Sequence, residues 1–111
     1  MMRPRGITQA RQHMLHLFKR RLKGSRQKLN RHYNRSRYIV DILWAQFQVG
    51  PYQYQVKHLR WYLTDAIEPL LPATRYQHWL TVKILLEALG KEDEWIGHLQ
   101  GSWTSPSNDE T

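Results

Sequence analysis

The histidines and acidic residues are the side chains of this 111-residue sequence whose spacing suggests catalysis or metal binding. His13 and His16 stand three residues apart, a spacing that brings two imidazoles to one side of a helix. No carboxylate is near them in sequence, and a metal centre needs further ligands, so we predict no metal site. Asp65 and Glu68 have the same spacing, but we expect both on the exposed face of a helix. These pairs do not predict acid–base catalysis.

Motifs of the common enzyme classes are missing from the sequence. It has no cysteine, which excludes a disulfide framework, a thiolate nucleophile and an iron–sulfur cluster. It has no glycine-rich phosphate loop, no nucleophile elbow and no HExxH zinc motif. His58, His78 and His98 each stand alone on a predicted helix, where we expect a surface or boundary position. We therefore predict a protein that is not an enzyme and that uses no cofactor.

Positive charge is the strongest functional signal, and it is concentrated in the first forty residues. This segment holds 12 of the 17 Lys and Arg residues and none of the nine Asp and Glu residues. Most of these cations are Arg, whose planar guanidinium binds phosphates and guanine edges in a bidentate manner. Such an acid-free block predicts nucleic acid as the partner, DNA rather than RNA. The predicted contacts are Arg11, Lys19, Arg20, Arg21, Lys23, Arg26, Lys28, Arg31, Arg35 and Arg37.

Aromatic residues lie among the basic ones and offer rings on which bases can stack. Tyr33 and Tyr38 follow Arg31 and Arg37 in sequence, but Tyr52 and Tyr54, in the loop GPYQYQ, are the ones that we expect to be exposed. The tryptophans lie in or beside helical apolar stripes, which favours a place in the core. We expect at least three of Trp44, Trp61, Trp79 and Trp95 there.

Other interpretations of the basic segment stay open at this point. Its amphipathic helix suits docking on an acidic protein or in a ribonucleoprotein, with the apolar stripe of residues 14–22 as the contact. An Arg-rich, acid-free helix is also typical of organelle targeting segments and of helices that lie on membranes. A solvated tail without a partner is the simplest alternative. We expect a cytoplasmic or nucleoid-associated protein, with organelle import as the alternative.

Apolar periodicity and helix-stop residues predict an all-α protein, a small bundle of about four helices preceded by a basic amphipathic arm. Residues 1–37 form this arm. It begins with a helix capped by Thr8 that runs to about Lys23. A hinge over residues 25–37 follows, which is either a loop or a helix that becomes ordered on a partner.

The helical domain is expected over residues 38–100, and its core is small enough to favour a protein partner or a second copy of the chain. A capping box of Thr74 and Gln77 marks the start of its most apolar helix. Residues 101–111 are expected to be a disordered tail, in which only Trp103 is suited to docking. No apolar run is long enough to span a bilayer. The helices are expected over residues 36–49, 56–68, 74–89 and 92–99.

The stretch from Arg37 to Trp103 resembles the helical, SAM-like core-binding domain of tyrosine recombinases and phage integrases. The similar segments are YIVDILWAQF, QVKHLRWYLTDAI and LLPATRYQHWLTVKILLEALG, with motifs matching at Tyr38 to Asp41, Trp61 to Leu63, and Thr74-Arg75. The resemblance implies a clamp of helices on duplex DNA and a role in DNA recombination. It also implies phosphate contacts from Lys57, Arg60, Arg75 and Lys83. The family's catalytic Arg, Lys, His and Tyr would follow this region, so the resemblance implies binding without cleavage here.

Overall fold

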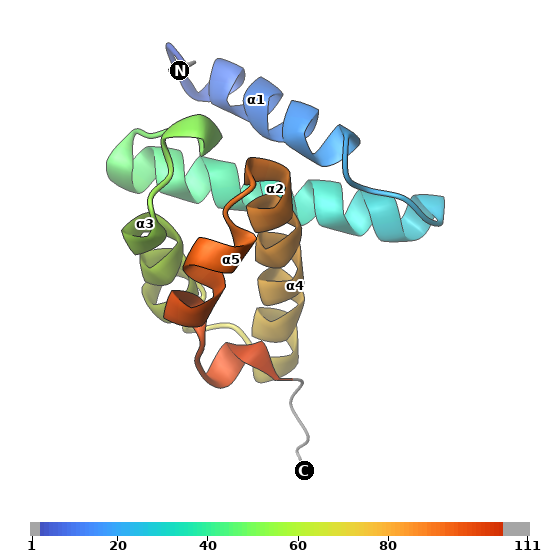
Figure 1. Ribbon diagram of the computed structural model, residues 1–111, viewed down its shortest axis with the longest axis vertical. Helices are drawn as coiled ribbons and strands as arrows, with labels where there is room; N and C mark the ends of the chain where they lie inside the picture. The colour runs from blue at the N-terminus through green and yellow to red at the C-terminus, as the bar shows by residue number, and fades with distance from the viewer. Residues whose placement is uncertain (1–2, 106–111) are drawn as a thin grey trace.

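The computed structural model describes residues 3–105, which fold into packed helices with no β-strand among them. This confirms the all-α prediction. In Figure 1, α1 lies across one side of α2, while α3, α4 and α5 pack on its other side. The α-helices are α1 (Ile7–Lys19), α2 (Arg26–Phe47), α3 (Val56–Trp61), α4 (Pro72–Leu89) and α5 (Glu92–Trp95). Between and after them lie the short 3-10 turns Pro51–Gln53, Ile96–Leu99 and Ser102–Thr104 and the π turn Tyr62–Ala66.

Helix α1 is part of the core. It begins after Gly6 without a side-chain cap, so the predicted cap at Thr8 is wrong, and it ends at Lys19 rather than near Lys23. Its apolar stripe is buried against the other helices, with Met14 and Phe18 at most 1% exposed. The stripe predicted as an outward docking surface is therefore mostly occupied within the chain, because burial of these side chains stabilises the fold.

Helix α2 is continuous through the segment predicted as a hinge, so the loop alternative for residues 25–37 is wrong, and a helix forms there from Arg26. It starts at Arg26, where the hydroxyl of Ser25 accepts a hydrogen bond of 3.3 Å from the backbone N–H of Lys28. The boundary predicted between residues 37 and 38 falls in the middle of this helix. The first half of α2 shows no apolar periodicity in the sequence, because two of the positions that it buries are occupied by the polar residues His32 and Ser36.

Two turns set the direction of the chain between α2 and α4. After α2 the backbone passes close to the start of the chain, where a Cβ at Gly50 would collide with the ring of Pro4. After α3 the helix widens into the π turn, closed by a 3.2 Å bond from the N–H of Ile67 to the carbonyl of Tyr62. The π turn ends ahead of Pro69, which cannot continue a helix.

Helix α4 starts at Pro72, two residues before the capping box predicted at Thr74, and it has no side-chain cap. Proline suits this first position because its fixed φ matches the helix and its missing N–H would have no partner there. The predicted C-terminal stop is confirmed, since Gly90 adopts φ 71° directly after the helix. The helix runs through the core and buries Trp79, Val82, Leu85 and Leu86.

The C-terminal segment is ordered at its start. Residues 102–104 form a turn, and the buried indole of Trp103 donates a 2.8 Å hydrogen bond to the carbonyl of Leu99. Docking of Trp103 is thus confirmed, whereas the disorder predicted from residue 101 does not hold for this turn. The rest of the predicted tail, from residue 106, lies outside the described residues.

The aromatic residues are not buried where the sequence predicted. Tyr54, expected at the surface, is only 6% exposed, because its ring packs in the core near His58. Tyr52 is partly buried and lies against the ring of His13. The prediction that at least three of the four tryptophans of the helical stripes are in the core is wrong, because only Trp79 is buried. The other three are partly exposed and pack against the core: Trp44, Trp61 and Trp95.

Candidate nucleic-acid interface

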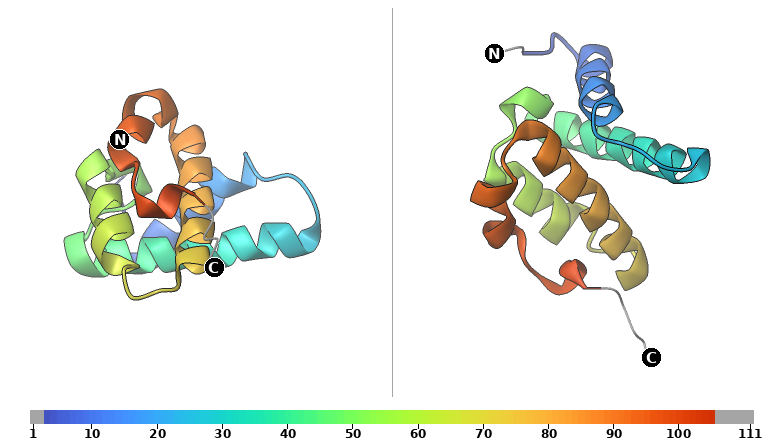
Figure 2. Two further views of the ribbon diagram at one scale, coloured as in Figure 1. Left: turned by 90° about the horizontal axis from the view of Figure 1, so that it is seen from below. Right: turned by 45° about the vertical axis from the view of Figure 1, so that its right-hand side comes forward.

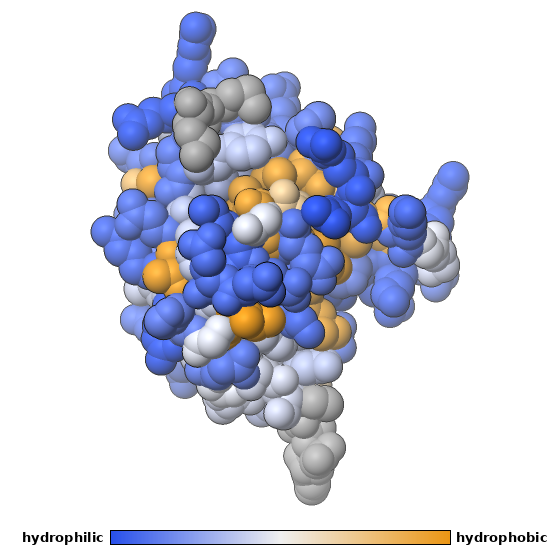
Figure 3. All heavy atoms as spheres, in the orientation of Figure 1, coloured by the Kyte–Doolittle hydropathy of each residue, from blue (hydrophilic) through white to orange (hydrophobic). Residues whose placement is uncertain are grey.

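The cations predicted to bind nucleic acid are concentrated where α1 ends and α2 begins. This part of the molecule projects away from α3 and α5 (Figure 2). Figure 3 shows hydrophilic side chains along the same edge. All of its Lys and Arg side chains are exposed, and Leu22 and Leu29 are the partly buried residues between them. We call this group the basic end: Lys19, Arg20, Arg21, Lys23, Arg26, Lys28 and Arg31.

The charge of the basic end has little compensation within the described part of the chain. None of its members forms a salt bridge there. Arg21 lines a hollow together with Glu87, Glu92 and Asp93, so these acids offset part of its field. The first turn of α2 holds no acidic residue, and the N-terminal end of a helix itself carries a partial positive charge. The result is a positive surface suited to an anionic partner.

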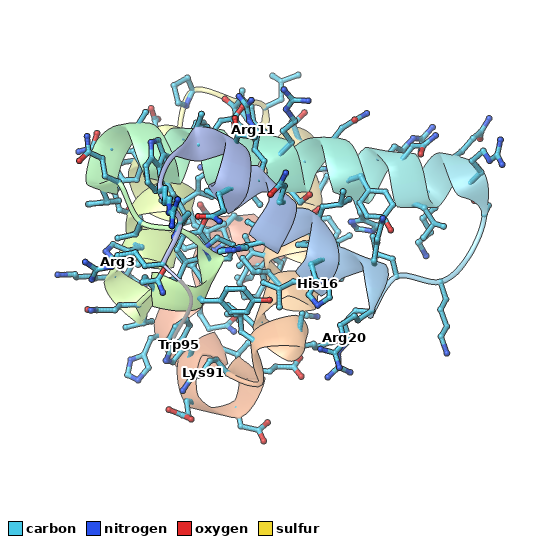
Figure 4. All side chains as sticks on the ribbon, turned by 90° about the horizontal axis from the view of Figure 1, so that it is seen from above. Arg3, Arg11, His16, Arg20, Lys91 and Trp95 are labelled. Atoms are coloured by element: carbon cyan, nitrogen blue, oxygen red, sulfur yellow. The ribbon has the colours of Figure 1, made fainter. Side chains whose placement is uncertain are left out.

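Arg11 lies apart from the basic end and is already paired. Its Nε and Nη2 donate to the two carboxylate oxygens of Asp41 on α2, at 2.7 and 3.0 Å. The hydrogen bond with Asp41 raises the pKa of Arg11 above its ordinary value. In Figure 4, Arg11 points toward α2, whereas Arg20 points to the other side of α1. Arg11 therefore has an internal role that the sequence did not suggest.

Arg35 and Arg37 follow the basic end along α2 but point in different directions. Arg37 is exposed and lines a groove between α1 and α2. Arg35 is partly buried, and its Nη1 donates to the carbonyl of Gln77 at 3.4 Å and to the hydroxyl of Thr81 at 3.3 Å. Burial, and after it the charge of Arg31, lowers the pKa of Arg35 below its ordinary value.

The cations suggested by the family resemblance are not gathered with the basic end. Lys57 and Arg60 are on α3, which lies at the opposite side of the molecule from the turn between α1 and α2 (Figure 1). Arg60 donates a 2.6 Å hydrogen bond to the carbonyl of His98. Arg75 and Lys83 are partly buried on α4, and the Nε of Arg75 is buried without a hydrogen-bond partner among the described residues.

Three histidines are buried, although the sequence predicted surface or boundary positions for His58 and His78 and singled out no role for His32. His32 Nδ1 lies 2.9 Å from the hydroxyl of Thr81, and His78 Nδ1 lies 2.7 Å from that of Tyr62. Burial lowers the pKa of all three below the usual value, that of His78 to about 4. They are therefore neutral at pH 7 and add nothing to the positive charge.

His13 and His16 do not belong to a cluster of metal-ligating side chains within the part of the chain that the structure describes. Among residues 3–105, no three His, Asp or Glu side chains come together in a way that could hold a metal ion. The same residues contain no helix with both the length and the hydropathy needed to cross a membrane. Neither finding assigns a function.

Tyr38 is the exposed aromatic residue next to the cations of α2, whereas the sequence predicts Tyr52 and Tyr54 as the exposed rings. Its side chain is 42% exposed, and its ring packs edge-on against those of Tyr62 and His78. Helical spacing was the available signal, since Tyr38 follows Arg31 by seven residues, two turns along the same face.

No known protein family matches the chain, and no curated protein or solved structure is significantly similar to it.

Proposed function

We propose that the chain binds nucleic acid, duplex DNA in the first place, through the basic end and without catalysing a reaction. The observation that carries this proposal is the group of exposed cations at the turn between α1 and α2, none of them in a salt bridge among the described residues. Phosphate contacts from such a surface position a protein on DNA and do not read its sequence.

The shape of the basic end supports duplex DNA over duplex RNA. The first turns of α2 project from the helices around them (Figure 2). A helix is about 10–12 Å wide with its side chains, which fits the major groove of B-DNA, about 12 Å wide. The major groove of A-form RNA is too deep and narrow for such an element. Competition between duplex DNA and structured RNA tests this preference.

The burial of α1 also favours this proposal over docking on an acidic protein or a membrane through the same helix. Those alternatives need the apolar stripe of α1 at the surface, but Met14, Leu17 and Phe18 are buried in the core. Leu15 is the large apolar side chain of α1 that stays exposed. Using the stripe for a partner would require α1 to leave the fold.

A salt series of DNA binding tests the proposal directly. If 6 to 10 phosphates are contacted, the affinity for a duplex falls about 10³- to 10⁵-fold between about 50 and 200 mM salt, because bound counterions are released. Replacing Lys19, Arg20, Arg21 and Lys23 by Ala should weaken binding by similar factors for different DNA sequences. It should also reduce the salt slope by about one per lost contact.

A variant that loses the same total charge elsewhere is the matched control. Arg3, Arg5, Lys57 and Lys91 lie outside the basic end, and their replacement by Ala should change binding much less. Equal effects of the two quadruple variants would contradict a localised interface. No binding of duplex at low salt would refute the proposed function, and tighter binding of RNA would replace DNA as the ligand.

A further inference from the structure

A stripe of charged and aromatic side chains leads from the basic end to a hollow between α2 and α4. Lys28, Arg31, Arg35 and Tyr38 are spaced by three or four residues, so they lie along one side of α2 over about 15 Å. The hollow at its far end is lined by Arg35 together with the α4 residues Ala73, Thr74, Gln77 and His78.

Arg35 is held at the hollow by a network that fixes its side chain. The Thr81 hydroxyl accepts a hydrogen bond from the guanidinium of Arg35 and donates one to the carbonyl of Gln77 at 3.3 Å. The same hydroxyl lies 2.9 Å from Nδ1 of the buried His32. The same carbonyl also accepts from Arg35. These bonds to α4 limit the rotamers of Arg35, which reduces the entropy lost when it binds a ligand.

The charge of Arg35 lacks a counterion. It is partly buried, it forms no salt bridge within residues 3–105, and Arg31 precedes it by one helical turn. A partly desolvated cation with cationic neighbours is stabilised by a bound anion, and a guanidinium pairs best with a planar or tetrahedral oxyanion such as phosphate.

His78 adds a polar group to the wall of this hollow. Its side chain is more than nine-tenths buried, and Nδ1 is engaged with the Tyr62 hydroxyl, while Nε2 has no partner among the described residues. When the Tyr62 hydroxyl donates to Nδ1, the proton of the neutral ring is on Nε2, which is then a donor for a phosphate oxygen.

Tyr38 supplies an aromatic surface beside the same hollow. Its ring centroid lies 5.4 Å from that of His78, and the edge-on contacts with His78 and Tyr62 fix its orientation. Tyr38 as a residue is 42% exposed to solvent. A fixed, exposed ring next to a phosphate-binding cation is the arrangement on which unpaired bases stack.

We propose that the hollow is a nucleotide site in which Arg35 binds a phosphate and Tyr38 stacks on an unpaired base, so that the preferred DNA carries a single-stranded extension beside its duplex. This inference rests on the proposed function and deepens it. The duplex is held at the basic end, and the extension follows the stripe along α2 to α4.

The test compares three DNA ligands by fluorescence anisotropy: a blunt duplex, the same duplex with a short extension, and that duplex with an abasic extension. The abasic form keeps the phosphates and lacks the bases. We expect the complete extension to bind about tenfold more tightly than the abasic one, because a base that stacks on an aromatic ring adds to the affinity. Tyr38→Leu should remove this difference, and Tyr38→Phe should keep it.

Arg35→Gln tests the phosphate contact, with Arg37→Gln as a matched control on the exposed side of the same helix. Because it keeps the phosphates, the abasic extension should bind more tightly than the blunt duplex. Arg35→Gln should remove this difference, whereas Arg37→Gln should leave it in place. Thermal melting shows whether both variants fold. If Arg35→Gln does not fold, the Tyr38 variants still test the nucleotide site.

The outcomes separate the two proposals. If the wild-type protein binds the blunt and extended duplexes equally, or if Tyr38→Leu keeps the preference for bases, the nucleotide site is wrong while DNA binding at the basic end stands. If no DNA binds at low salt, the proposed function itself is wrong.

Discussion

The two halves of α2 belong to one continuous helix but differ in the side chains that they bury. In the half from Arg26 to Arg37 the buried side chains are the polar His32 and Ser36. The half from Tyr38 to Phe47 buries Ile39, Val40 and Leu43 in the core. The comparison indicates how a small fold can carry a positively charged projection: the packed half provides the stability that the charged half lacks, because one helix joins them.

A proline within the charged half should have the largest effect on this comparison. Asn34 is exposed, and Asn34→Pro removes one helical hydrogen bond and introduces a clash with the preceding turn. We expect the free energy of unfolding to fall by about 3 kcal/mol or more. Urea denaturation measures the change, and Asn34→Ala is the control, which should be nearly neutral. If the proline variant is as stable as the alanine variant, the two halves are independent.

Removing the charges of the first half should separate binding from stability. The triple variant Arg26→Gln, Lys28→Gln and Arg31→Gln should bind duplex DNA about ten- to a hundredfold more weakly at low salt. Its stability should be unchanged or slightly higher, since cations at the N-terminus of a helix are unfavourable. Anisotropy and thermal melting give the two readouts. A large loss of stability would show that these side chains serve the fold instead.

Acid should weaken the packing of both halves, because each half contacts buried histidines. His32 belongs to the first half, and His58 packs on Phe47 of the second, with the ring centroids 4.7 Å apart. Below about pH 6.5 these histidines bind protons in the unfolded chain but stay neutral in the folded chain, because burial lowers their pKa. For His78 this difference extends down to about pH 4. Stability is therefore full above this range and decreases as the pH falls through it.

Melting temperatures measured from neutral to mildly acidic pH follow this effect, and we expect a decrease of several degrees. His78→Gln should reduce the pH dependence, while His16→Gln, at an exposed position, should leave it as in the wild type. A melting temperature that does not change between about pH 7 and 5 would contradict the assignment of neutral buried histidines.

The smallest effect is expected for the pair between α1 and the packed half of α2. Asp41→Asn removes the partner of Arg11, whose side chain is 36% exposed. Because water screens such a pair, the melting temperature should decrease only slightly. The net charge rises by one because the carboxylate of Asp41 is lost, so DNA binding should become marginally tighter. A large destabilisation would mean that the pair fixes α1 on α2.

The sequence allowed the helices with clean apolar stripes to be predicted, and it failed where polar residues are buried. The all-α class, the stop at Gly90 and the docking of Trp103 all followed from local chemistry. The first half of α2 was left open between a loop and a helix because His32 and Ser36, both polar, fill core positions, and the partner of His32, Thr81, is distant in sequence.

The sequence was enough to predict that the candidate site is positively charged, but not which side chains come together in it. The number of Lys and Arg residues identified the basic segment, and helical spacing indicates which of them share one side of a helix. The pairing of Arg11 with Asp41 joins residues 30 apart, and the hollow at Arg35 needs α4, which begins far along the chain. Contacts between distant segments depend on tertiary packing, which local periodicity does not contain.

The close approach of Pro4 to Gly50 suggests where the protein can be labelled or immobilised. Pro4 is buried at this contact, next to the turn Pro51–Gln53 and on the side of the molecule away from the basic end (Figure 1). A fluorophore, affinity tag or sensor surface coupled ahead of Pro4 would leave the positively charged edge open to solution, which makes this the preferred point of immobilisation.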